Sequence, residues 1–193
     1  NSINSYIFFH LLYLKLNKKD KVILGNGTAC VVGLQCADIK KGTRVFTNSG
    51  SASMGYDLPA AVGASIANKN NRVICVTGDG SIMMNLQEME TIRANALPIK
   101  LLIINNNVYS IIRRRQKDLF RKRTIGTDPS NGVTVPNFSE LANCFGFQYV
   151  KIKKVDELEQ GLLKVFQTNG PVLCEIIARD DQSYIELGYC KSA

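Results

Sequence analysis

The stretch that decides the fold runs from residue 73 to residue 112 and reads VICVTGDGSIMMNLQEMETIRANALPIKLLIINNNVYSII. Its first segment, Val73–Thr77, is apolar except for its last residue, as is typical of strands that a parallel sheet covers on both faces. The glycine-rich turn Gly78–Gly80 follows, and we predict a helix of about four turns beginning at Ser81. A second apolar strand, Lys100–Ile104, then leads directly into three asparagines. The stretch therefore predicts a strand–helix–strand unit.

Polar residues follow both predicted strands at the point where each ends. The carboxyl ends of parallel strands form the crevice in which ligands bind, so Asp79 and Asn106 should lie close together. Gly78 and Gly80 let the backbone approach an anion, and the helix start at Ser81 would offer free N–H groups to a phosphate. Carboxylate, amide and backbone carbonyl oxygens suit Mg²⁺ that carries phosphates.

Two motifs together resemble a known family. The sequence GDGS, followed after one helix and one strand by Asn-Asn, is similar to the thiamine diphosphate binding signature. The segment 48–64, NSGSASMGYDLPAAVGA, resembles the part of that family that lies against the pyrimidine ring of the cofactor. Over roughly residues 20–180 the chain is similar to the C-terminal, diphosphate-binding domain of acetolactate synthase-like enzymes.

The resemblance implies roles for individual residues. Mg²⁺ would be bound by Asp79, by the side chain of Asn106 and by the backbone oxygen of Val108, while Asn105 braces the turn. The positions implied to contact the cofactor diphosphate are Gly27, Thr28 and Ala29. The carbonyl of Ala52 would hold the 4′-amino group of the cofactor, and Met54 would prop the cofactor into a bent shape. The further cofactor-contacting positions are Ser51, Gly78, Gly80, Ser81 and Tyr109, and Ile111 and Ile112 would face the reacting carbon.

The same resemblance implies an activity and partners. The cofactors would be thiamine diphosphate and Mg²⁺, and the substrate a small 2-oxo acid that is decarboxylated or joined to an acceptor. The family activates the cofactor with a glutamate from a separate pyrimidine-binding domain, for which this chain has no room. We therefore expect a fragment of a longer enzyme, with that domain elsewhere and a homo-oligomer in the intact protein. Biosynthetic acetolactate synthases carry a tryptophan where Arg115 stands, and this chain has none, which leaves a related decarboxylase or carboligase open.

Composition fits one soluble α/β domain spanning 1–193. The length of 193 residues supports one full core, and 45% hydrophobic with 21% charged residues excludes a disordered or fibrous chain. The net charge of +8 is local, because seven of the 24 basic residues lie in 113–123. That segment reads as a solvated helix and flap, with recruitment of an anionic substrate or a partner as the functional alternative. No aromatic interleaving accompanies it, so we do not expect nucleic-acid binding.

The cysteines indicate a reducing compartment. Six of them, at 30, 36, 75, 144, 174 and 190, lack CxxC or Cys/His spacing, so we predict free thiols in a cytoplasmic protein rather than disulfides or zinc. The apolar run 6–16 is too short to span a bilayer and contains Lys15, so we expect no membrane segment or signal peptide. The only histidine, His10, lies in the predicted N-terminal helix as a surface or interface residue, so we expect no His-based triad, and the start at Asn1 suggests an excised fragment.

The periodicity predicts a doubly wound, mainly parallel six-stranded sheet with helices on both faces. The predicted strands are 22–24, 44–47, 73–77, 100–104, 147–152 and 171–178. The predicted helices are 2–17, 29–37, 58–68, the four-turn helix from Ser81, 137–146 and 156–168, the last capped by Asp156. Residues 124–136 read as a loop and a mobile lid. Glu175 is unusual within a buried strand, and the tail 179–193 diverges from the family pattern.

Two other functions compete with this interpretation. A dinucleotide-binding dehydrogenase domain would need a third glycine in the first turn, where GNGTAC stands, and an acid after the next strand, where Thr47 and Asn48 stand. A non-catalytic module could bind a partner through the basic segment and retain a vestigial site. An intact pair of Asp79 and Asn106 speaks against that second reading.

Overall fold

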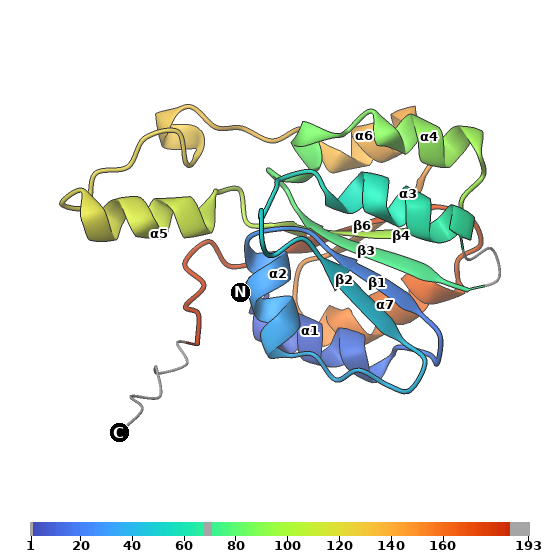
Figure 1. The fold of residues 1–193 in the computed structure, drawn as a ribbon. Helices are drawn as coiled ribbons and strands as arrows, with labels where there is room; N and C mark the ends of the chain where they lie inside the picture. Colours follow the sequence, from blue (N-terminus) through green and yellow to red (C-terminus); the bar gives the residue numbers. More distant parts are fainter. Residues whose placement is uncertain (1, 68–70, 186–193) are drawn as a thin grey trace, which may run out of the picture.

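Six parallel strands form one sheet in the order β2-β1-β3-β4-β6-β5 (Figure 1). The computed structural model describes residues 2–67 and 71–185. The strands are β1 Lys21–Leu24, β2 Arg44–Thr47, β3 Val73–Gly78, β4 Lys100–Asn105, β5 Gln148–Ile152 and β6 Val172–Ile177. Every described pairing is parallel, which confirms the predicted sheet.

Helices cover both faces of the sheet, as predicted (Figure 1). The helices are α1 Ser5–Leu14, α2 Thr28–Gln35, α3 Asp57–Ala67, α4 Glu88–Ala94, α5 Ser110–Leu119, α6 Phe138–Cys144 and α7 Leu158–Gln167. Helices α1, α2 and α7 pack on one face, and α3, α4 and α6 on the other. Helix α5 extends away from the sheet and buries none of its residues.

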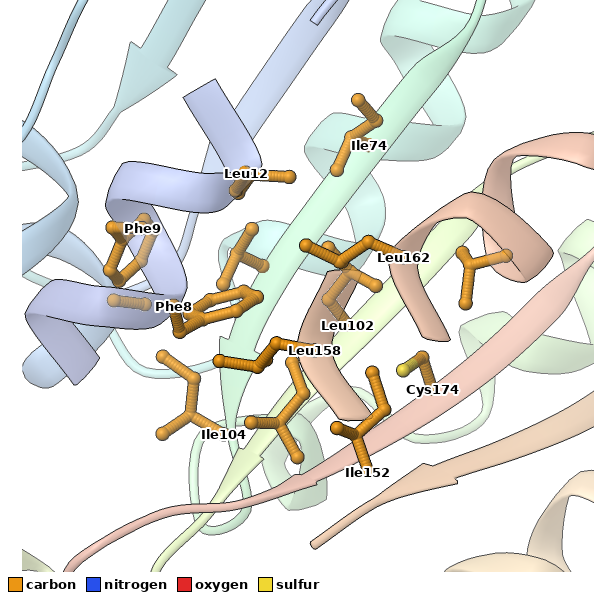
Figure 2. Packing of buried hydrophobic residues seen from close by; sticks show 14 of the residues in the cluster. Phe8, Phe9, Leu12, Ile74, Leu102, Ile104, Ile152, Leu158, Leu162 and Cys174 are labelled. Carbon is orange, nitrogen blue, oxygen red and sulfur yellow. The ribbon is translucent and has the colours of Figure 1, made fainter. Parts of the chain in front are cut away.

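The core on the first face joins the N-terminal helix to the last one (Figure 2). Phe8 and Leu12 of α1 pack with Leu102 of β4 and Leu162 of α7, and all four side chains are fully buried. Each such side chain contributes about 1.5–3 kcal/mol to stability relative to an exposed one. The central strands β3 and β4 are buried over five consecutive residues, which explains their apolar sequence.

The predicted four-turn helix after Ser81 is wrong. A 3-10 turn, Ile82–Met84, comes first, and α4 begins only at Glu88. Asn85 causes the break, because its backbone leaves the helical region at φ −137° and ψ 37° and its side-chain amide donates to the Gly55 carbonyl at 2.8 Å. Ser81 therefore precedes one short 3-10 turn. It does not begin a long helix whose dipole would attract a phosphate.

Other helix ends also differ from the prediction. The N-terminal helix is shorter than 2–17, because Asn4 caps it and Ile3 instead forms a parallel bridge with Ala178. Asp156 does not cap α7: it lies in a 3-10 turn, and Glu157 precedes the helix. The predicted end of the third helix, Asn68, lies outside the described residues.

The close contact of α2 with the sheet predicts a difference between two helical glycines. An alanine Cβ at Gly33 would lie 2.9 Å from Leu24 Cδ1 and 3.0 Å from Phe9 Cε1, whereas Gly63 of α3 has nothing within 4 Å. Gly63→Ala should raise the free energy of unfolding by about 0.5–1 kcal/mol through helix propensity. Gly33→Ala should be less stable than Gly63→Ala by about 1–3 kcal/mol, the usual cost of overpacking a core. Urea unfolding of the two variants measures the difference, and equal stability would contradict this packing.

Candidate functional site

A cleft of about 420 Å³ opens at the carboxyl ends of β1, β3 and β4. This is the size and place expected of a ligand site in a parallel sheet. Most of the predicted site residues line it, namely Gly27, Thr28, Ala52, Met54, Gly78, Asp79, Gly80, Ser81, Asn106, Val108, Tyr109, Ile111 and Ile112. Two do not: Ala29 is buried behind the first turn of α2, and Ser51 is exposed outside the cleft.

Asp79 lies at the centre of the wall formed by β3 and β4. Its carboxylate is buried and accepts three backbone N–H groups: Oδ2 from Asn106 at 3.1 Å and from Asn107 at 2.6 Å, and Oδ1 from Gly80 at 2.8 Å. Its own N–H donates to the Ile104 carbonyl at 3.1 Å. Asp79 and the asparagine turn are therefore neighbours, as the sequence predicts.

The Asp79 carboxylate has no cationic side chain among these contacts. Burial raises its pKa to about 6, and the three amides, led by that of Asn107, act in the opposite direction. At neutral pH the group is a buried anion, and the hydrogen bonds that the described residues donate to it all come from backbone N–H groups. A bound cation would therefore improve its environment, because an opposite charge nearby favours the ionised form.

Further oxygen atoms lie beside Asp79 on the asparagine turn. Asn106 is 9% exposed, and its Oδ1 accepts the Val108 N–H at 3.3 Å. The Val108 carbonyl accepts from the Ser110 N–H at 2.9 Å. Each of these oxygens, and Asp79 Oδ1, takes part in one such hydrogen bond and keeps a second lone pair. One carboxylate, one amide and one carbonyl fit Mg²⁺ bound together with phosphates, and the described residues contain no cluster of three His, Cys, Asp or Glu for a cation held by protein alone.

The opposite wall of the cleft is the N-terminus of α2. Gly27 precedes the helix with a φ of 67°, and no side chain caps the first N–H groups. Such free N–H groups bind anions, which fits a diphosphate. The Thr28 hydroxyl lies 3.4 Å from that of Ser110 and 2.7 Å from that of Tyr184, so the C-terminal segment reaches this end of the cleft.

The third wall is the loop between β2 and α3. Met54 lines the cleft, and Ala52 has a φ of 48°, a left-handed conformation that is uncommon for a residue with a Cβ. The Ala52 carbonyl, the predicted acceptor of an amino group, accepts the side-chain amide of Asn26 at 3.2 Å. Asn26 therefore fixes the orientation of this loop, a role that the sequence interpretation missed.

Asp57 is a second residue that the sequence interpretation missed. It is completely buried at the start of α3, and its Oδ2 accepts the hydroxyls of Thr77 at 2.7 Å and Ser81 at 3.0 Å. It thus holds the residues on either side of the Gly78–Gly80 turn. Burial raises the pKa of Asp57 despite these hydrogen bonds. The sequence did contain a signal, because Asp57 stands two residues before Pro59 in the first turn of the helix. The same pattern is equally typical of an ordinary helix start, so it did not identify this role.

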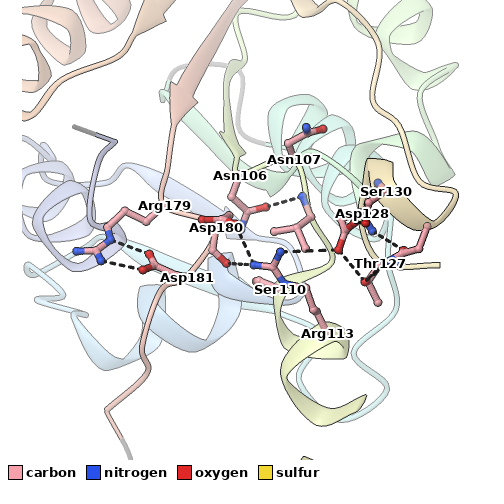
Figure 3. A network of polar contacts seen from close by, with 12 residues as sticks. Asn106, Asn107, Ser110, Arg113, Thr127, Asp128, Ser130, Arg179, Asp180 and Asp181 are labelled. Atoms are coloured by element: carbon pink, nitrogen blue, oxygen red, sulfur yellow. Dashed lines mark hydrogen bonds and ion pairs between the residues drawn. The ribbon is translucent and has the colours of Figure 1, made fainter. Parts of the chain in front are cut away.

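The loop 124–136 and the C-terminal segment meet at Arg113, in the first turn of α5 (Figure 3). Its guanidinium donates to the Asp180 backbone oxygen at 2.5 Å and lies 3.8 Å from the Asp128 carboxylate. The Tyr109 N–H donates to the Thr127 carbonyl at 2.8 Å. The loop contains only a 3-10 turn, Pro129–Asn131, and these contacts attach it to the rim of the cleft.

The remaining sequence expectations concern cysteines and membranes. Cys30, Cys36, Cys75, Cys144 and Cys174 are all free thiols, as predicted, and Cys190 lies outside the described residues. Within residues 2–67 and 71–185, no helix has the length and apolar character needed to cross a bilayer.

Several known proteins are similar in sequence to this chain. The chain is 38% identical over 140 residues to the acetolactate synthase large subunit of Cyanidium caldarium, covering 72% of this chain and 24% of that protein. It is 37% identical over 131 residues to the acetolactate synthase isozyme 2 large subunit of Escherichia coli, covering 68% and 23%. It is 33% identical over 142 residues to the chloroplastic acetolactate synthase 3 of Brassica napus, covering 72% and 22%. The matched part of the chain thus covers less than a quarter of the length of these relatives.

A family match covers the cleft and most of the sheet. The family described as "Thiamine pyrophosphate enzyme, C-terminal TPP binding domain" matches residues 25–176, from the turn after β1 into β6. All three walls of the cleft lie within the matched residues. The chain therefore belongs to the thiamine pyrophosphate enzymes, as their C-terminal TPP binding domain.

Proposed function

We propose that this domain binds Mg²⁺ and thiamine diphosphate for a 2-oxo acid decarboxylase or carboligase of the acetolactate synthase type. The observation that carries the proposal is that two walls of the same cleft offer complementary groups, oxygen atoms on one and free N–H groups on the other. Oxygens of Asp79, Asn106 and Val108 lie on one wall, and the uncapped N-terminus of α2 lies on another. A diphosphate bridged by Mg²⁺ would satisfy both walls, since its oxygens bind the helix N–H groups and the metal binds the protein oxygens.

The residues of the chain would each have a limited task. Bound thiamine diphosphate would supply an electron sink for cleavage between the carbonyl and carboxyl carbons of a 2-oxo acid. Asp79 would bind the metal and offset part of its charge, and Met54, which lines the cleft, would hold the cofactor in its bent shape. Ile111 and Ile112 line the cleft at the start of α5 and would exclude water from the reacting end.

We further propose that the domain works beside a second, pyrimidine-binding domain and in a homo-oligomer. The relatives are about three times as long as this chain, which leaves room for further domains. Helix α5 buries none of its residues, and Ile112, Leu119 and Phe120 are between 45% and 63% exposed. In this arrangement a glutamate supplied by the other domain would activate the cofactor, and the small 2-oxo acid would enter between the two.

A thermal melt tests cofactor binding. Saturating thiamine diphosphate with Mg²⁺ should stabilise the folded chain by about 2.7 kcal/mol at 100 times the dissociation constant, and EDTA should remove the effect. Asp79→Ala should abolish the shift, whereas Asp156→Ala, which changes an exposed acid after edge strand β5 and outside the cleft, should keep it. An equal shift in Asp79→Ala would contradict the proposed metal site. A shift with NAD and none with thiamine diphosphate would favour the dinucleotide alternative, and no shift with either would favour the non-catalytic module.

The raised pKa of Asp79 predicts the pH dependence of this stabilisation. The ionised carboxylate binds the metal, so the Mg²⁺-dependent part of the shift should be large at pH 7.5 and decline as pH falls through about 6. For the metal-free protein the sign is opposite: the folded pKa is above the unfolded one, so stability declines as pH rises towards 6. Melts with Mg²⁺ and with EDTA at each pH separate the two effects. Asp79→Asn, which cannot titrate, should show neither trend; the same trends in that variant would assign them to another group.

A further inference from the structure

Glu175 is a buried carboxylate in the middle of the otherwise apolar strand β6. It is 4% exposed, and the described residues around it supply three donors. Lys151 Nζ lies 2.9 Å from Oε2, and the Tyr149 hydroxyl donates to the same oxygen. Asn105 Nδ2, from the end of β4, donates to Oε1 at 2.6 Å. The carboxylate therefore bridges edge strand β5 and the strand that leads into the metal-binding turn.

The environment of Glu175 keeps it ionised. Burial by itself raises its pKa, but hydrogen bonds from Tyr149, Lys151 and Asn105 together hold the pKa below its usual value. A buried charge with all its partners in place is tolerated, whereas removal of a partner leaves it uncompensated. Neutral residues of similar shape would fill this strand at lower cost, so the carboxylate requires an explanation beyond packing.

The contact with Asn105 leads directly to the site. With Nδ2 held by Glu175, Asn105 Oδ1 accepts the Asn107 N–H at 3.1 Å. The same Asn107 N–H donates to Asp79 Oδ2 at 2.6 Å. Asn107 has a φ of 56°, a left-handed conformation that its surroundings must hold in place. A continuous path of hydrogen bonds thus joins Glu175 to the carboxylate of Asp79.

We propose that Glu175 is a positioning residue for the Asn105–Asn107 turn, which it fixes by orienting the side chain of Asn105. The inference rests on the proposed function in one respect, namely that this turn and Asp79 bind Mg²⁺. Without the carboxylate, the Asn105 amide can rotate and present its NH₂ group to the Asn107 N–H, which places two donors against each other. The turn then loses the contact that orients the Asn107 N–H towards Asp79.

Amide hydrogen exchange in the protein without added cofactor tests the inference. Glu175→Gln retains the size of the side chain, but its one acceptor oxygen is drawn to the Lys151 ammonium and its NH₂ group faces Asn105. Exchange at Asn107 should become at least about tenfold faster relative to Leu102 in the centre of β4, since only a local unit opens. In binding experiments, the dissociation constant for Mg²⁺ in the presence of thiamine diphosphate should rise about 10–100-fold, as for other residues that orient metal ligands.

Two further variants separate positioning from general destabilisation. Asn105→Ala should release the Asn107 amide to the same extent, and Glu175→Gln in that background should add nothing. Lys151→Met removes another partner of Glu175 on the side away from the turn, so it should leave Asn107 exchange unchanged even if the melting temperature falls.

Unchanged Asn107 exchange in a folded Glu175→Gln variant would overturn the inference whatever Asn105→Ala shows, and so would additive effects in the double variant. If Glu175→Gln does not fold, unchanged Asn107 exchange in Asn105→Ala would still overturn the inference, because the path from Glu175 to Asn107 runs through Asn105. If the natural sequence shows no Mg²⁺-dependent binding, the proposed function fails, whereas the exchange result still decides whether Glu175 fixes the turn.

Discussion

The hydrogen bonds between the Asp79 carboxylate and the N–H groups of Asn106 and Asn107 join the ends of the two central strands. They place an anion at the bottom of the cleft and hold it there with backbone dipoles only. Isolated burial of a carboxylate is costly, and the raised pKa of Asp79 shows that the dipoles compensate for that cost only in part. Under the proposed function, a bound cation would remove the remaining cost, so the same arrangement that weakens the free domain would favour metal binding.

Because the donors belong to the backbone, the site depends on the path of the chain as much as on the identity of side chains. Gly80 is an example, because the backbone there passes so close to Tyr109 that a Cβ would lie 1.8 Å from its Cε1 atom. Asp57 braces the first of the two turns from below through Thr77 and Ser81. On the other side, the asparagine turn is tied through Asn105 to the outer strands. Buried polar side chains thus fix a geometry that the motif residues alone would not hold.

The sequence predicted the parts of this structure that depend on local pattern. Strand β2 has the predicted bounds, and β3 and β4 differ by one residue, because continuous apolar segments between turn residues identify buried parallel strands. The proximity of Asp79 and Asn106 followed from the rule that ligands bind at strand carboxyl ends. The break at Asn85 was not predictable, because it depends on a hydrogen bond to Gly55, thirty residues earlier in the chain. The roles of Asn26 and Asp57 were missed for the same reason: their partners are distant in sequence, and no local pattern marks them.

The two ends of the cleft differ in how deeply they are buried, and this difference bears on which reactions such a domain can select. The diphosphate end is formed by strand ends and the first turn of α2, and it is buried among the elements of the sheet. The other end is formed by α5, which has no buried residue. Contacts at the diphosphate end are the same before and in the transition state. They would therefore supply affinity for the cofactor without discriminating between reactions. Under the proposed function, discrimination between 2-oxo acids would require contacts around the reacting carbon, where the described part of the domain offers only part of a wall. The choice of substrate would then depend on α5 together with the surface that packs against it.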